Sequence, residues 1–517
     1  MFDRTILAFG SESGNAAHLA KDLATRLQET SKECSCGDLN NLHLASLDAD
    51  DLLLVITSTF GDGDPPGNAR AFAEQLSKIS SVSPFQYAVF GIGDVSYPQF
   101  CRFGQAVDAS LYEKGARRLV NRVDADLDYQ SFFTVWESCL SDIIAGKKRD
   151  GLDLSLRVEA YSESRPYLAR VNHIEPLPSP SGDVYNVNLD IQNSGIYYRA
   201  GDLLHLLPGD DAALYSELAD WFGDDGDVSP LAGKELRVLG KSLLRGLANA
   251  SNNSVLKQNL KFKNKSTLAE YLYGRDLLDV LQDCGNPGFI SIEELAALLP
   301  MRSARPYLIA SCGVTEGGSR DSVDICIRRV AYSKSDRHYR GSASHALCQA
   351  QAGDSFQVFV RSNPEFWLDQ TQSGPVLMIG SDTGISAHVG LLHALENSSI
   401  KREAILVVDS TSEHPYESKL TAWIQKGVLK VVKTTSTADL EAENQVAQAL
   451  FDSASDIYQM IEHQAHIYIC GQKRSLDTPI DQSLRTIMQQ QGNFSEVQAQ
   501  DRLQKIYAEK RIHKILY

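Results

Sequence analysis

The first indication of the fold is Phe9-Gly10-Ser11-Glu12-Ser13-Gly14-Asn15-Ala16, which joins an apolar run at 5–9 to an amphipathic run at 16–28. A buried strand followed directly by a helix is the first unit of an open parallel α/β sheet. Small and hydroxylic residues at such a turn let backbone N–H groups and side-chain oxygens surround a phosphate at the helix N-terminus. Because the stretch has no lysine, it differs from the loops of nucleotide hydrolases and fits a single phosphate monoester. An ordinary strand–helix turn is the alternative interpretation.

The same alternation of apolar and amphipathic runs continues to about residue 145 and predicts an α/β domain over residues 1–146. A polar stretch around 146–151 then interrupts the pattern, so a linker is expected over 147–163. The strands and helices expected after the first loop lie at 52–57, 69–76, 87–91 and 105–113.

Two further loops are expected at the edge of this sheet that carries the first one. Residues 57–66 follow one predicted strand and residues 91–97 follow the next. Ligands of open α/β sheets bind outside the carboxyl ends of the strands. Each loop contributes one aromatic side chain, Phe60 and Tyr97, which could stack on a planar ring. Together the three loops predict an FMN site, although the aromatic residues could also be simple loop anchors.

The remaining sequence predicts two further domains. From about residue 164, short β-type runs bounded by Gly, Pro, Ser and Asp predict an antiparallel barrel over 164–372, with a helical insert at about 210–300. After Gly374 the α/β alternation returns and predicts a third domain over 373–517. The fold class is therefore α/β plus β-barrel. The expected strands are 185–191, 203–207, 307–311, 323–330 and 356–360 in the barrel, and 376–379, 404–408, 429–432 and 466–470 in the last domain.

Composition narrows the class of protein. The 517 residues include 50 Lys and Arg against 66 Asp and Glu, a formal net charge of −16. This balance argues against nucleic-acid binding and favours a partner with a basic docking surface. No apolar run approaches the ~20 residues of a membrane span, and no signal peptide is recognised. Nine Cys, which lack metal-ligand spacing apart from Cys34-Ser35-Cys36, suit a reducing cytoplasm, and no metal site is expected.

Specific motifs resemble a known family. Residues 56–66, 89–101 and 121–130 resemble the flavodoxin-type FMN domain of the diflavin reductases, most closely those of the sulfite-reductase type. The resemblance implies a flavodoxin-like first domain. The residues it implies for FMN, together with those of the three loops, are Ser11, Glu12, Ser13, Gly14, Asn15, Ala16, Ser58, Thr59, Phe60, Gly61, Gly93, Asp94, Tyr97, Phe100 and Asp126.

A second set of motifs resembles the FAD barrel of the same family. Residues 305–311 resemble its Arg-x-Tyr-Ser segment, in which Arg pairs with the FAD pyrophosphate and Tyr packs on the isoalloxazine. Leu308 replaces the family's Ser, whose hydroxyl assists hydride transfer. A surface ion pair is the alternative role for Arg305. The residues that the resemblance implies for FAD are Tyr198, Arg305, Tyr307, Leu308, Ser311, Gly341, Ser342, Ala343, Ser344 and, over the flavin face, the terminal Tyr517.

The last domain resembles the family's pyridine-nucleotide domain, with departures. The resemblance implies catalytic roles for Cys470, beside the nicotinamide, and for Tyr517, although a buried Cys is often only part of a core. It also implies NADPH contacts from Thr383 and Ser436. Asp382 stands in the turn that should approach the pyrophosphate, where two negative groups repel by on the order of 1–4 kcal/mol.

Two more departures affect this domain. Thr437 replaces the family's Arg for the 2′-phosphate, and Ile515 replaces an acidic residue near the chain end. An alignment error over 434–444 would explain the first but not Leu308 or Asp382. NADPH binding is therefore expected to be weak.

The resemblance implies a diflavin oxidoreductase that passes electrons from NADPH through FAD and FMN to a haem, siroheme or iron–sulfur acceptor protein. The altered nucleotide motifs favour a second hypothesis, an FMN/FAD electron carrier reduced by another donor. A scaffold without flavins is a third hypothesis, and the intact flavin motifs argue against it. The sequence predicts no oligomeric state.

Overall fold

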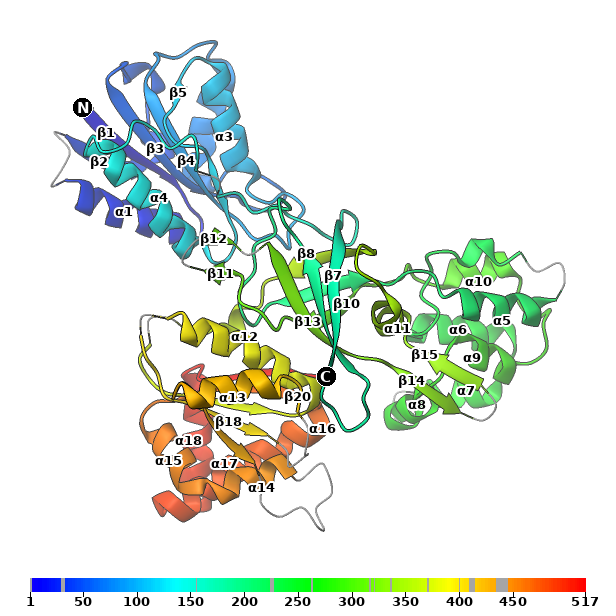
Figure 1. Cartoon of the computed structure of the whole chain (residues 1–517). Helices are drawn as coiled ribbons and strands as arrows, with labels where there is room; N and C mark the ends of the chain where they lie inside the picture. Colours follow the sequence, from blue (N-terminus) through cyan, green and yellow to red (C-terminus); the bar gives the residue numbers. More distant parts are fainter. Residues whose placement is uncertain are drawn as a thin grey trace. The chain divides into compact units, whose positions relative to one another are not determined.

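The computed structural model divides the chain into two compact units (Figure 1). The first comprises Met1–Ser162 with Asn193–Tyr197, and the second comprises Glu163–Gln192 with Tyr198–Tyr517. The structure describes residues 2–28, 33–154, 156–223, 227–261, 264–315, 318–319, 321–334, 337–369, 372–398, 400–408, 414–433 and 445–517.

The first unit contains a parallel sheet in the order β2-β1-β3-β4-β5, with β6 also paired to β4. The strand order changes direction between β1 and β3, which is the point at which a flavodoxin-like sheet binds its ligand. The strands are β1 (Arg4–Gly10), β2 (Cys34–Asp38), β3 (Asp51–Ser58), β4 (Gln86–Ile92), β5 (Arg117–Arg118) and β6 (Val123–Ala125).

Helices cover both faces of this sheet because alternate strand residues point to opposite sides. In β3, Leu52, Leu54 and Ile56 pack in the cluster that contains α1 and α4. Leu53 and Val55 pack in the cluster that contains α2 and α3. The predicted α/β layering of this part of the chain is therefore confirmed. The helices are α1 (Asn15–Leu27), α2 (Arg70–Lys78), α3 (Arg102–Glu113) and α4 (Tyr129–Ile144).

The second unit begins with an antiparallel sheet in the order β10-β9-β16-β7-β8-β13. An isolated bridge pairs Ile309 with Ile325, which links the two edge strands, and closure of the sheet into a barrel stays a prediction. The predicted strand at 307–311 is displaced, since β10 ends at Leu308. The strands are β7 (Tyr167–Leu177), β8 (Val184–Asp190), β9 (Leu203–Leu207), β10 (Arg305–Leu308), β13 (Ser322–Arg328) and β16 (Ser355–Arg361).

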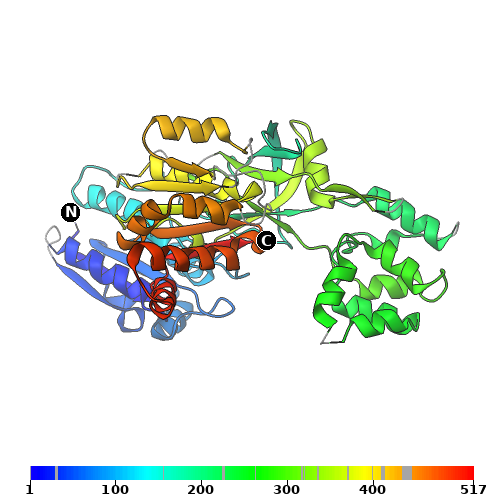
Figure 2. The same ribbon diagram turned by 90° about the horizontal axis from the view of Figure 1, so that it is seen from below.

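The helices between β9 and β10 gather in one group (Figure 2). Their buried side chains form an apolar core of their own. Its principal helices are α5 (Ala212–Phe222), α6 (Lys241–Ala250), α7 (Ser254–Asn259), α8 (Lys265–Leu272), α9 (Leu277–Cys284) and α10 (Ile292–Leu298). A hairpin of β14 (Ala331–Lys334) and β15 (Arg337–Arg340) follows β13 and leads into α11 (Ser342–Gln349). This hairpin was not predicted from the sequence. A second short hairpin pairs β11 (Val314–Thr315) with β12 (Gly318–Ser319).

The last part of the second unit contains a five-stranded parallel sheet in the order β19-β18-β17-β20-β21. Its strand order changes direction between β17 and β20. The strands are β17 (Val376–Gly380), β18 (Ala404–Val408), β19 (Lys430–Lys433), β20 (His466–Gly471) and β21 (Ile512–Leu516). The helices are α12 (Ile385–Glu396), α13 (Glu417–Gln425), α14 (Gln445–Asp452), α15 (Ala454–Glu462), α16 (Lys473–Leu476), α17 (Thr478–Gly492) and α18 (Glu496–Ala508).

Within the described ranges, no helix is both long and apolar enough to cross a membrane. In the same ranges, no group of three or more His, Cys, Asp and Glu side chains is placed to hold a metal ion.

Candidate functional site

The loop between β1 and α1 has the geometry of a phosphate cradle. Gly14 occupies the N-cap position of α1 and has a left-handed backbone (φ 88°). No described side chain accepts from the first N–H groups of this helix. The Ser11 N–H donates to Asn68 Oδ1 (2.8 Å). Ser11 Oγ is buried and has no hydrogen-bond partner among the described residues. A buried hydroxyl without a partner beside open helix N–H groups fits a bound phosphate.

Glu12 has a supporting position in this loop. Its Oε1 accepts the Gly67 N–H (2.6 Å), which ties the loop to the turn that contains Asn68. The Asn68 amide in turn donates to Asp38 Oδ1 (2.9 Å). The other predicted residues of the loop divide by exposure: Ser13, Gly14 and Asn15 are exposed, and Ala16 is fully buried.

The two aromatic side chains lie exposed on the loops that follow β3 and β4. Phe60 is 46% exposed and Tyr97 is 62% exposed. Hydrogen bonds fix both turns: the Phe60 N–H donates to Asp64 O (2.9 Å), and the Tyr97 N–H donates to Asp94 O (3.0 Å). Large exposed aromatic rings held on tight turns at the ligand edge of the sheet fit the two faces of a flavin ring.

Other residues predicted for FMN are buried beneath these loops or hydrogen-bonded to their backbone. Phe100 is buried, and a Cβ on Gly93 would lie 2.7 Å from its ring. Asp126 is also buried, and its Oδ1 accepts the Val95 N–H (3.0 Å). Buried positions of this kind hold the third loop in place. In the second loop, Ser58 Oγ donates to Gly10 O (3.4 Å), Thr59 Oγ1 accepts the Phe103 N–H (3.2 Å), and Gly61 has a left-handed backbone.

In the second unit, Arg305 forms an ion pair with the buried carboxylate of Glu235. Its Nη2 lies 2.7 Å from Glu235 Oε2, and its Nη1 donates to Ser303 O (2.9 Å). Burial would raise the pKa of Glu235, but the Arg305 guanidinium and the Val238 N–H outweigh it and lower that pKa below its ordinary value. A pyrophosphate would therefore have to share this guanidinium with a buried carboxylate.

Two of the residues predicted for FAD are buried and hydrogen-bonded to each other. The Tyr198 hydroxyl lies 2.8 Å from Ser311 Oγ and donates to Ser322 O (2.9 Å). Tyr198 and Ser311 are both almost completely buried. Tyr307 is half-buried, and Leu308 packs in the core that adjoins the last sheet.

Residues 341–344 form a second cradle at the N-terminus of α11. Gly341 occupies the N-cap position of this helix, and no described side chain accepts from the first N–H groups. These N–H groups therefore remain available to an anion. The turn is held to the preceding chain because Ser344 Oγ accepts the Val330 N–H (3.1 Å). Ser342 is half-buried beside the buried Ala343.

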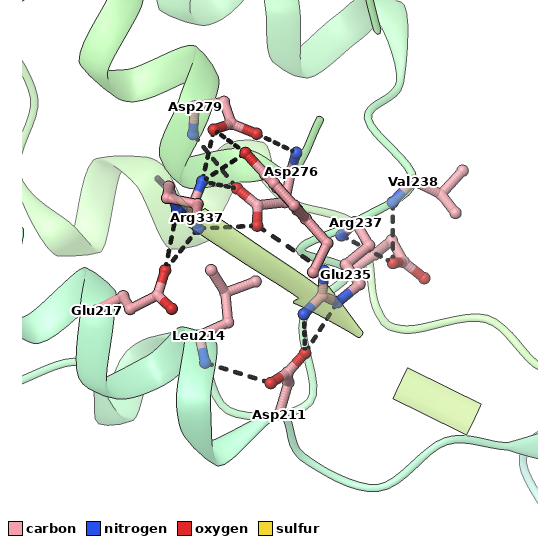
Figure 3. Close-up of polar contacts among 10 residues, drawn as sticks. Asp211, Leu214, Glu217, Glu235, Arg237, Val238, Asp276, Asp279 and Arg337 are labelled. Carbon is pink, nitrogen blue, oxygen red and sulfur yellow. Dashed lines mark hydrogen bonds and ion pairs between the residues drawn. The ribbon is translucent and has the colours of Figure 1, made fainter. Parts of the chain in front are cut away.

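A charged cluster anchors the hairpin that leads into this cradle (Figure 3). Arg337, the first residue of β15, donates to Asp276 through both of its Nη atoms (3.0 Å each). It also donates to Asp279 Oδ1 (2.5 Å) and Glu217 Oε2 (2.5 Å). Tyr339 donates to the same Asp279 oxygen (2.7 Å). This cluster was not predicted from the sequence; its one local signal is the capping box at the start of α9, formed by Asp276 and Asp279.

At the strand-order change of the last sheet, two predicted nucleotide-site residues meet. The Tyr517 hydroxyl lies 2.8 Å from Thr383 Oγ1, and the Tyr517 N–H donates to Gly471 O (3.1 Å). Cys470 is fully buried in the core, and burial raises the pKa of its thiol. Ser436, together with Thr437, lies outside the described residues.

Comparison with known proteins agrees with this architecture. The flavodoxin family model matches residues 7–133. The chain is 28% identical to the sulfite reductase [NADPH] flavoprotein alpha-component of Bacillus subtilis, over 98% of this chain and 88% of that protein. It is 26% identical to the protein of the same name from Zymomonas mobilis (99% and 89%) and 27% identical to that from Vibrio cholerae (99% and 87%). The chain thus contains a flavodoxin domain. It is homologous, over close to its full length, to the flavoprotein alpha-components of sulfite reductases.

Proposed function

We propose that this chain is a diflavin oxidoreductase that moves electrons from NADPH through FAD and FMN to a haem, siroheme or iron–sulfur acceptor protein. The near full-length homology to proteins named as the NADPH-dependent flavoprotein component of sulfite reductase carries this proposal. Its net charge of −16 suits an acceptor with a basic docking surface. A cytoplasmic location is part of the same proposal.

In the first unit, the chain's own residues would hold FMN. Ser11 Oγ and the N–H groups at the start of α1 would receive the phosphate, which supplies the partner that this hydroxyl lacks. Phe60 and Tyr97 would pack against the ring. When bound, the two flavins would supply the redox chemistry, while the protein determines their position and electrostatic surroundings.

In the second unit, the N-terminus of α11 would receive the FAD pyrophosphate. Its N–H groups are open to an anion, and the Arg337 cluster holds the preceding strand. Arg305 would contribute only in competition with Glu235. The domain functions are therefore proposed as FMN binding for 1–146, a linker for 147–163, FAD binding for 164–372 and nucleotide binding for 373–517.

A second candidate function is an FMN/FAD electron carrier with little or no NADPH oxidation. One observation favours it: Asp382 places a carboxylate, held by Arg328, in the turn after the first strand of the nucleotide-type sheet. Such a carrier would take electrons from another donor.

Anaerobic reduction of the purified protein tests both candidates. The protein should release one FMN and one FAD on denaturation, and dithionite should bleach both flavins. Rapid bleaching by NADPH supports the oxidoreductase. Bleaching by dithionite but not by NADPH or NADH supports the carrier, and a colourless protein that cannot be reconstituted with either flavin contradicts both.

A further inference from the structure

Asp382 lies where the topology of the last sheet would place a ligand. The strand order changes direction between β17 and β20, and open α/β sheets bind ligands in the crevice at that point. Asp382 begins the short turn Asp382–Gly384, which connects β17 to α12. A dinucleotide bound at this crevice would bring its pyrophosphate to the N-terminus of α12.

The carboxylate of Asp382 is held in this turn from two sides. Arg328, the last residue of β13, forms an ion pair with Asp382 Oδ1. Gln472, in the loop after β20, donates to Asp382 Oδ2 (3.5 Å). Thus the carboxylate joins the turn after β17 to the loop after β20. The same partial positive charge of the helix N-terminus that attracts phosphate also stabilises a carboxylate.

The backbone at Asp382 is left-handed, with φ 56°. This conformation is easy for glycine and is tolerated by Asn and Asp, because their short polar side chains can adopt it at modest cost. Asn and Gly are therefore suitable replacements that should keep the turn.

We propose that Asp382 is an internal anion that occupies the pyrophosphate position of this crevice and, through its ion pair with Arg328, weakens the binding of every pyrophosphate-bearing nucleotide. The inference rests on the proposed function for the identity of the ligand as a pyridine dinucleotide. It makes Asp382 a residue that lowers the affinity for both nucleotides alike. Arg328 is its positioning residue, because Arg328 is also held by Asp183 and by Ser181 Oγ (2.8 Å).

Binding of NADP⁺ to the full-length flavin-loaded protein tests the proposal without any electron transfer. Isothermal calorimetry would compare the parent chain with Asp382→Asn and Asp382→Gly, and NAD⁺ would be measured in parallel. Both variants should bind NADP⁺ at least about tenfold more tightly. NAD⁺ should gain by a similar factor, because the pyrophosphate is common to both nucleotides. Unchanged or weaker binding by both variants, with flavin content and circular dichroism like the parent, overturns the proposal.

Asp183→Asn is the matched control. It removes the other carboxylate that pairs with Arg328, yet Asp183 lies in the turn between β7 and β8 and not in the Asp382 turn. Its affinity for NADP⁺ should stay within about twofold of the parent. A gain equal to that of Asp382→Asn would overturn the proposal, because the effect would then follow from loss of either carboxylate beside Arg328 and not from the carboxylate in the Asp382 turn. Failure of NADPH to reduce the parent's flavins would contradict the proposed oxidoreductase, whereas the calorimetric comparison would still decide the role of Asp382.

Discussion

Arg337→Met should destabilise the second unit and release FAD while leaving FMN bound. Arg337 pairs with Asp276, whose side chain is 2% exposed, so the substitution leaves a buried carboxylate without its main partner. Loss of one partner of a buried pair costs about 3–5 kcal/mol. Arg237 remains 3.8 Å from Asp276 and reduces this loss. The Glu217 contact adds little because that side chain is 41% exposed. The expected decrease in the free energy of unfolding is about 2–4 kcal/mol.

Urea titrations of the full-length chain would measure this decrease, and flavin released after gel filtration would measure FAD and FMN occupancy. FAD should be lost because β15 leads directly into the cradle at 341–344. Arg275→Met is the matched control on the same insert, since its partner Asp283 is 45% exposed and the pair should contribute about 0–1 kcal/mol.

A second variant separates the buried charge from simple loss of packing. Asp276→Asn combined with Arg337→Met removes the unpaired carboxylate but keeps a side chain that can cap α9. This double variant should recover part of the lost stability. If Arg337→Met lowers the free energy of unfolding by less than about 1 kcal/mol and keeps as much FAD as Arg275→Met, then the pair of Arg337 with Asp276 does not hold the cradle.

Three further perturbations test the flavin and nucleotide domains. Ser11→Ala should weaken FMN binding about tenfold to a hundredfold, measured by fluorescence titration of the FMN-depleted protein, because a hydrogen bond to a charged phosphate is lost. Tyr97→Ala should weaken FMN binding by a similar factor through lost stacking. Burial lowers the pKa of His388 from 6.5 to about 4, so the folded protein rejects a proton that the unfolded chain accepts. The free energy of unfolding is therefore unaffected by His388 above pH 6.5 and decreases as the pH falls toward 4, by about 2 kcal/mol at pH 5. Urea titrations should show that His388→Phe removes this decrease.

Each of these has a control that changes the same residue type at an exposed position. Ser13→Ala, in the same loop, should leave FMN affinity almost unchanged, and equal losses at both serines would contradict the phosphate role of Ser11. Tyr112→Ala, on α3, should not affect FMN binding, whereas an effect as large as that of Tyr97→Ala would argue against stacking. His463→Gln should keep the parent's acid sensitivity, and a His388→Phe protein that keeps it too would show that other groups cause it.

The architecture of the first unit was predictable because its signals are local. The strands of a parallel sheet are buried on both faces, so they appear as continuous apolar runs such as β3. By contrast, the long strand β7 was missed because much of it is exposed and its apolar pattern is broken. The hairpin of β14 and β15 was missed for the same reason, since all four residues of β14 are exposed.

The loop at 9–16 and the aromatic residues Phe60 and Tyr97 can be recognised from the amino-acid sequence, because each depends on neighbouring residues along the chain. Which carboxylate each arginine meets depends instead on the tertiary structure. Arg305 pairs with Glu235 across 70 residues, and Arg337 pairs with Asp276 across 61. Arg328 pairs with Asp382 across 54. Local propensity contains no information about such pairs, because the fold of the second unit brings together residues that are far apart in the sequence.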